Sequence, residues 1–173
     1  MKITLKNVRL SFPSLFSKAK FDGQETKFEA TFLLNKEEHS ASIAEIKEAI
    51  ATKIKTDLKG AKLAADKICL RDGDEADYDG YAGCMSIKAA NNNRPLVIDR
   101  DKTPLAEEDG KVYSGCYVNA IIELWTQNNA YGKRINAKLL GVQFYADGEA
   151  LGSKSKISVD EFEAFEEAEN PFA

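Results

Sequence analysis

The 173-residue chain has one histidine, three cysteines and no long apolar run. Cys69, Cys84 and Cys116 are far apart and form no C-x-x-C pair, which argues against disulfides or zinc and for reduced, buried thiols in a cytoplasm. A single histidine, His39, allows no His-based catalytic triad and no transition-metal site, and is expected at the surface just before a helix. No segment approaches 18 apolar residues, so no membrane span is predicted, and residues 1–10 lack the apolar core of a signal peptide.

Catalytic motifs are missing as well. The chain contains no P-loop, no G-x-G-x-x-G and no G-x-S-x-G pattern. Its length suits one domain, or one domain with a tail. We therefore expect a protein that is not an enzyme, with no catalytic residues, no metal site and no cofactor.

Basic residues are absent from the last fifteen positions, 159–173, which hold six carboxylates and three Phe. The other 158 residues carry 24 basic against 22 acidic residues, a formal charge of +2, whereas the whole chain has −4. The acidic segment 159–173 can imitate a polyanion, and its Phe residues can enter a pocket on a partner. A solvated tail without a role, or an amphipathic final helix, fits the composition equally well. The candidate partner-binding residues are Asp160, Glu161, Glu163, Glu166, Glu167, Glu169 and Phe172.

Hydrophobic periodicity predicts a mainly β chain with one helix. Isoleucines at helical spacing predict the helix at 42–58, with Ser42 and Glu45 as a capping box. A change of parity at Lys6-Asn7 predicts a bulge in the first strand. Six or seven strands around one inserted helix favour a small antiparallel barrel over a parallel βαβ sheet. The strands are expected at 3–12, 28–34, 68–71, 84–90, 96–99, 113–126 and 134–145.

The last two predicted strands carry the clearest binding pattern. Alternation gives each strand an apolar face and a mixed face, and in a hairpin the two mixed faces coincide. Exposed aromatics interleaved with cations are what single-stranded nucleic acid needs, because bases stack on rings and cations neutralise phosphates. Packing of Trp125 against the inserted helix is an equally weighted alternative. The candidate residues are Tyr117, Trp125, Tyr131, Lys133, Arg134, Asn136 and Lys138.

A second basic cluster is predicted around the flexible segment 91–93. Its candidate phosphate contacts are Lys88, Arg94 and Arg100, with Lys102 beside them. Because Arg100 lies between Asp99 and Asp101, a local ion pair fits it as well as a phosphate contact does.

The segment 72–80 is acidic, with Asp72, Asp74, Asp77 and Asp79. Its spacing fails the EF-hand pattern, and no helices flank it. We therefore interpret it as a structural or solvated turn, although a metal-dependent nuclease built on these four carboxylates stays the alternative enzyme hypothesis.

Three segments resemble the tailed-phage single-stranded DNA-binding proteins: RLSFPSLFSKAK at 9–20, RPLVIDRDKTPL at 94–105 and the block 113–152. The resemblance implies an OB-fold that coats single-stranded DNA without sequence preference. It also implies a plan like that of the phage T7-type protein, a barrel followed by a disordered acidic tail with an aromatic near its end. Here Phe172 is penultimate rather than terminal. The expected division is residues 1–152 for the OB-fold domain and 153–173 for linker and tail.

On this interpretation the protein acts in the cytoplasm of a bacterial host during phage DNA replication or recombination. Its expected partners are single-stranded DNA and, through the tail, replication or recombination proteins, with no membrane. The oligomeric state stays open between monomer and homodimer. A protein-interaction adaptor that recruits partners by its acidic tail is the remaining non-enzymatic alternative.

Overall fold

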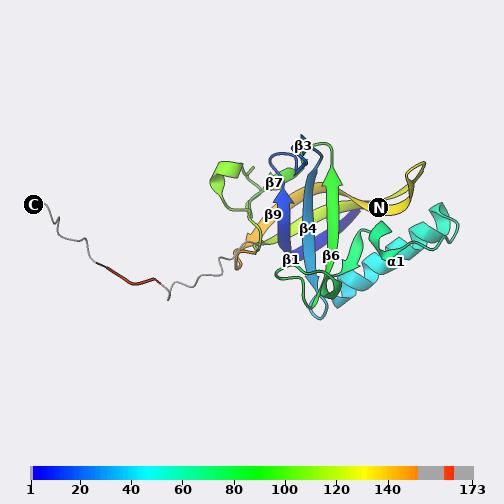
Figure 1. Cartoon of the computed structure of the whole chain (residues 1–173), viewed down its shortest axis with the longest axis horizontal. Helices are drawn as coiled ribbons and strands as arrows, with labels where there is room; N and C mark the ends of the chain where they lie inside the picture. Colours follow the sequence, from blue (N-terminus) through cyan, green and yellow to red (C-terminus); the bar gives the residue numbers. More distant parts are fainter. Residues whose placement is uncertain (1, 152–161, 166–173) are drawn as a thin grey trace, which may run out of the picture.

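The computed structural model describes residues 2–151 and 162–165 of the chain (Figure 1). Within these residues strands dominate, as the sequence predicts, and a single α-helix lies beside them. The strands are β1 (Lys2–Ser14), β2 (Lys20–Phe21), β3 (Gln24–Glu25), β4 (Phe28–Asn35), β5 (Leu70–Asp72), β6 (Cys84–Asn91), β7 (Leu96–Ile98), β8 (Tyr117–Asn129) and β9 (Gly132–Ala146). The helices are α1 (Ser40–Asp57) and the 3-10 turns η1 (Ala65–Lys67), η2 (Gly73–Glu75) and η3 (Glu107–Asp109).

Five strands close into a barrel. The order in the sheet is β5-β6-β4-β1-β8-β9-β7, and an additional pairing of β6 with β9 completes the ring. The closing pair is parallel, with Ala89 opposite Ala137, while the other pairs of the ring are antiparallel. An odd number of strands cannot alternate in direction all the way round, so the expected antiparallel barrel has one parallel pair.

The predicted bulge in β1 is confirmed. The pairing of β1 with β8 shifts between Leu5 and Val8, and Asn7 has a φ of 52°. His39 holds this bulge, because its Nε2 lies 3.2 and 3.1 Å from the carbonyl oxygens of Lys6 and Asn7. His39 therefore precedes the helix, as predicted, but it is half-buried and hydrogen-bonded to the bulge rather than simply exposed at the surface.

Helix α1 begins two residues before its predicted start. His39 is the N-cap and makes no side-chain capping bond, so the predicted capping box of Ser42 and Glu45 is wrong. The apolar face was predicted correctly, with Ile43, Ile46 and Ile50 buried. The helix packs against β8 and β9. The last residue of α1, Asp57, accepts a hydrogen bond of 2.8 Å from the hydroxyl of Thr126 on β8.

The core fills the barrel and continues beneath α1. Its largest fully buried side chains are Phe32, Leu5, Leu10, Leu33, Leu34, Ile46, Leu58, Ile87, Ile122, Leu124, Ile135 and Leu139. All three cysteines are free thiols; Cys116 is buried and the other two are half-buried. In the part of the chain that the structure describes, no helix is long and apolar enough to cross a membrane.

Candidate nucleic-acid interface

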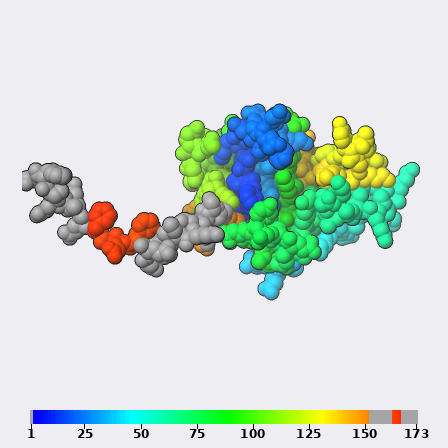
Figure 2. Space-filling model, in the orientation of Figure 1, coloured from blue at the N-terminus to red at the C-terminus, as the bar shows by residue number. Residues whose placement is uncertain are grey.

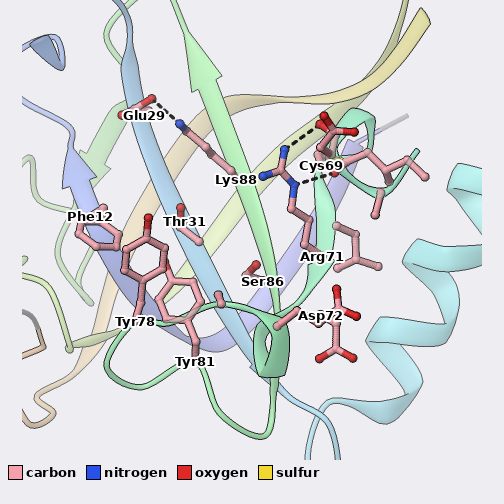
Figure 3. Close-up of a pocket in the computed structure, with 16 residues that line it drawn as sticks. Phe12, Glu29, Thr31, Cys69, Arg71, Asp72, Tyr78, Tyr81, Ser86 and Lys88 are labelled. Carbon is pink, nitrogen blue, oxygen red and sulfur yellow. Dashed lines mark hydrogen bonds and ion pairs between the residues drawn. The ribbon is translucent and has the colours of Figure 1, made fainter. Parts of the chain in front are cut away.

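A groove of about 790 Å³ lies over the outer faces of β4 and β6 (Figure 3). Four segments form it: the end of β1, the strand β4, the stretch 65–81 that carries β5 and η2, and the strand β6. Thr31 and Ser86, both buried, form part of its lining, and Lys88 and Arg71 extend over it. The groove therefore combines a polar lining, aromatic rings and cations on one surface.

Three aromatic side chains form one wall of the groove. The ring centroids of Phe12 and Tyr78 are 5.1 Å apart in an edge-to-face arrangement, and those of Tyr78 and Tyr81 are 5.2 Å apart. Tyr81 is buried, and its hydroxyl lies 3.0 Å from that of Ser11. Phe12 and Tyr78 are 53% and 59% exposed, so two large rings remain available to a ligand.

The exposed position of Phe12 follows from backbone strain. Its φ is 46°, in the left-handed region that a bulky residue rarely adopts, and the β1–β4 pairing shifts between Ser11 and Ser14. Such strain costs about 1–3 kcal/mol and is concentrated at functional sites. A second bulge in β1 thus presents Phe12 on the surface next to the groove.

An ionic clamp fixes the loop that carries Tyr78. Lys36, which follows β4, donates to Asp72 at 2.8 Å and to Asp74 at 2.6 Å, and Asp74 also accepts from the Gly83 amide at 2.7 Å. The hydrogen bond from Lys36 lowers the pKa of Asp72, and that from Gly83 lowers the pKa of Asp74. Position 73, between these two aspartates, has room only for glycine, because a Cβ there would lie 2.5 Å from the carbonyl oxygen of Cys84.

This clamp should open at acid pH. Both folded-state pKa values are lowered, so the carboxylates stabilise the loop fully above their ordinary pKa of about 3.9, and the contribution is lost as the pH falls through the lower folded-state values. We expect the Gly83 amide NMR resonance to shift below about pH 4. In Asp74→Asn the side-chain oxygen still accepts but does not titrate, so the resonance should stay in place. A resonance that does not move in the natural protein would contradict this role.

The strand registers place the groove and the β8–β9 hairpin on one continuous row. Ser11 pairs with Thr31, and Thr31 with Lys88. The Lys88 amide donates to the carbonyl of Cys69, and the Cys69 amide donates to that of Ile135 on β9. The next residue, Asn136, pairs with Trp125 on β8. Three strand steps of about 4.8 Å each, taken around the curved wall of the barrel, thus lead from Lys88 to Trp125.

The β8–β9 hairpin ends this row. The space-filling view shows it, in yellow, projecting from the body on the same side as α1 (Figure 2). Trp125 is 40% exposed, so it lies on the surface and not in the core. Tyr131 near the tip is 88% exposed, and Lys133 and Arg134 follow it on β9.

Comparison with known proteins identifies the family. A family model described as the ssDNA-binding protein of Enterobacter phage Enc34 matches residues 1–172. The chain belongs to the Enc34 ssDNA-binding protein family.

Similar proteins cover nearly the whole chain. Protein p50 of Acyrthosiphon pisum secondary endosymbiont phage 1 is 43% identical over 179 residues, which cover 98% of this chain and 96% of that protein. The single-stranded DNA-binding protein from bacteriophage Enc34, solved in complex with ssDNA, is 36% identical, with a TM-score of 0.79 and coverage of 87% and 89%. The bacteriophage T7 protein gp2.5 is 11% identical over 95% and 98% of the chains, with a TM-score of 0.50, and this shows a shared fold alone.

In this Enc34-family chain the predicted hairpin is confirmed. Trp125 pairs with Asn136, Gln127 with Arg134, and Glu123 with Lys138. The apolar face predicted for β8 is buried throughout, at Val118, Ala120, Ile122 and Leu124. The face that carries Trp125 therefore points outward.

Tyr117 does not join that group. It lies at the opposite end of β8, eight residues from Trp125, which corresponds to about 27 Å along a strand. Its ring packs below the guanidinium of Arg9 at 5.9 Å. Alternation correctly predicts the face of a strand, but residues on one face can still be far apart along it.

The second predicted basic cluster is not brought together as a unit. Lys88 lies in the groove, whereas Arg94 packs over the ring of Phe16 at 5.6 Å and Arg100 over that of Tyr145 at 5.8 Å. The carboxylate of Asp99 pairs with Lys111 at 2.9 Å. Loops after β6 and after β7 carry the two arginines, so their closeness in sequence does not make one surface.

Two carboxylates of the acidic turn at 72–80 have a structural role. Asp72 and Asp74 bind Lys36, and within residues 2–151 and 162–165 no group of three potential metal ligands is present. In the tail, Glu163 is exposed between the exposed Phe162 and Phe165. The other candidate tail residues, Asp160, Glu161, Glu166, Glu167, Glu169 and Phe172, lie outside the described residues, as does the expectation of disorder there.

Sequence reasoning missed Phe12, Tyr78 and Arg71 as groove residues. Tyr78 lies within the acidic turn, where the carboxylates suggested metal binding, and Phe12 is the last residue of the predicted strand 3–12, on the same parity as Val8 and Leu10. A usable signal was present in both places, because an aromatic ring beside Pro13 and one between two aspartates are poorly placed to be core residues.

Proposed function

We propose that this protein binds single-stranded DNA without sequence preference and coats it in phage DNA replication or recombination, without catalysing a reaction. The row of exposed side chains from Phe12 and Tyr78, past Lys88, to Trp125 is the observation that carries the proposal. Rings accept any base, and cations accept any phosphate, so this arrangement suits binding that ignores sequence. The similarity to an Enc34 protein solved in complex with ssDNA supports it.

The DNA path in this proposal crosses the strands of the barrel. OB-folds bind oligonucleotides on the face of their second and third barrel strands and through the loops between strands 1 and 2 and strands 4 and 5. Here these strands are β4 and β6, and the second loop is the β8–β9 hairpin. Phe12, Tyr78, Trp125 and Tyr131 would stack on bases. The proposed phosphate and hydrogen-bond contacts are Lys88, Arg71, Lys133, Arg134, Asn136 and Lys138, with Tyr117, Arg94 and Arg100 as peripheral candidates.

The remaining parts of the proposal concern the tail and the cellular setting. Residues 1–152 form the DNA-binding unit, and residues 153–173 the linker and an acidic tail that competes with DNA and recruits replication or recombination proteins. The free thiols and the phage family to which the chain belongs support action in the host cytoplasm. A nuclease based on the acidic turn is not supported, since Lys36 engages Asp72 and Asp74.

Titration with oligo-dT at several salt concentrations tests the function. Stacking of a base on Trp125 should quench the intrinsic fluorescence, and log affinity should fall with log salt by about 0.7 per neutralised phosphate. Trp125→Ala should weaken binding by about 1–3 kcal/mol, whereas Trp125→Phe retains a ring and should lose less. The oligonucleotide should stay intact with Mg²⁺ or Mn²⁺. Cleavage, or an affinity that ignores salt, would refute the proposal.

A further inference from the structure

The central cation of the groove already has a partner. Lys88 Nζ lies 3.2 Å from Glu29 Oε2, and both side chains line the groove (Figure 3). The pair is diagonal in the β4–β6 register, because Glu29 faces Ala90 while Lys88 faces Thr31. A carboxylate therefore stands on the surface along which phosphates would have to pass.

The two partners differ in freedom to move. The Lys88 side chain is 60% exposed and that of Glu29 is 26% exposed. The lysine has a long flexible stem and can turn toward a phosphate, whereas the shorter, more enclosed carboxylate stays beside β6. A phosphate that takes Lys88 thus displaces Glu29 from its partner and leaves two negative charges close together.

Resting on the function proposed above, we propose that Glu29 is an internal competitor of DNA. It occupies Lys88 in the free protein, and it repels the backbone once DNA is bound. The Glu29–Lys88 pair lowers both the affinity for DNA and the salt dependence of binding, and so makes it easier for bound DNA to dissociate.

Glu29→Gln tests this inference, because it keeps the shape of the side chain and removes its charge. In oligo-dT titrations between about 50 and 200 mM salt, affinity at low salt should rise about three- to tenfold, and the salt slope should steepen by up to about 0.7. Glu48→Gln on the exposed face of α1 removes the same charge far from the groove and is the matched control. It should change affinity much less.

The gain should depend on Lys88. In a Lys88→Met background, Glu29→Gln should raise affinity less, because there is no longer an ammonium group to release and only the repulsion between the carboxylate and the phosphates is relieved. Unchanged or reduced affinity of a folded Glu29→Gln variant would overturn the inference while the natural protein still binds oligo-dT. Failure of the natural protein to bind oligo-dT would instead overturn the proposed function itself.

Discussion

Replacing Phe12 and Tyr78 together by Ala should weaken binding to oligo-dT by about 2–6 kcal/mol, since each lost base–ring stack costs about 1–3 kcal/mol. Both rings are more than half exposed, so their removal takes little from the core. Their edge-to-face contact at 5.1 Å means that the two single effects need not add up. Fluorescence titration monitored at Trp125 measures the loss.

Two controls separate stacking from structure. Leu96→Ala removes an apolar side chain that is 61% exposed on β7, outside the groove and outside both OB-fold loops named above, and should have a much smaller effect. Phe12→Gly removes the ring but suits the left-handed φ of 46°, so it should weaken DNA binding without destabilising the bulge. A folded double variant with natural affinity would exclude DNA from this groove and leave the β8–β9 hairpin as the main contact.

Deleting residues 159–173 should raise the affinity for single-stranded DNA, most strongly at low salt, where screening is weakest. The chain leaves the barrel next to the groove, because the Leu151 amide donates to the Ser114 carbonyl at 2.9 Å and its side chain contacts Gly80, between Tyr78 and Tyr81. Six carboxylates on a linker that starts there have an effective concentration on the order of a millimolar. They should therefore compete with phosphates for the groove cations.

Separate variants can test the competition of the tail carboxylates with DNA and the binding of a partner by the tail. Converting its six carboxylates to amides should reproduce the gain in DNA affinity, because only the charge is removed. Phe172→Ala removes no charge, so it should leave DNA affinity almost unchanged while it impairs binding of a replication partner. Equal DNA affinity of the full-length and truncated proteins at low salt would refute the competition and leave the tail as a partner tether or a solvated end.

Local pattern predicted a large part of this protein. Alternation predicted the buried face of β8 and the hairpin in which the mixed faces of β8 and β9 coincide, and the change of parity at Lys6-Asn7 predicted the bulge. Isoleucines at helical spacing gave the buried face of α1. These features depend on residues a few positions apart, which is the range over which periodicity and turn chemistry act. The concentration of negative charge in the tail is likewise a property of the sequence alone.

Only the tertiary structure decided what faces the groove. Phe12 and Tyr78 are 66 residues apart, and Glu29 and Lys88 are 59 apart, and no local pattern relates either pair. Strand pairing brings them together, because β4 pairs with both β1 and β6 although α1 and several loops separate β4 from β6 in the chain. Periodicity determines which face of a strand a side chain occupies. Long-range strand pairing determines which neighbours the side chain meets there. It therefore also determines whether an acidic turn supplies metal ligands or holds a tyrosine beside the groove.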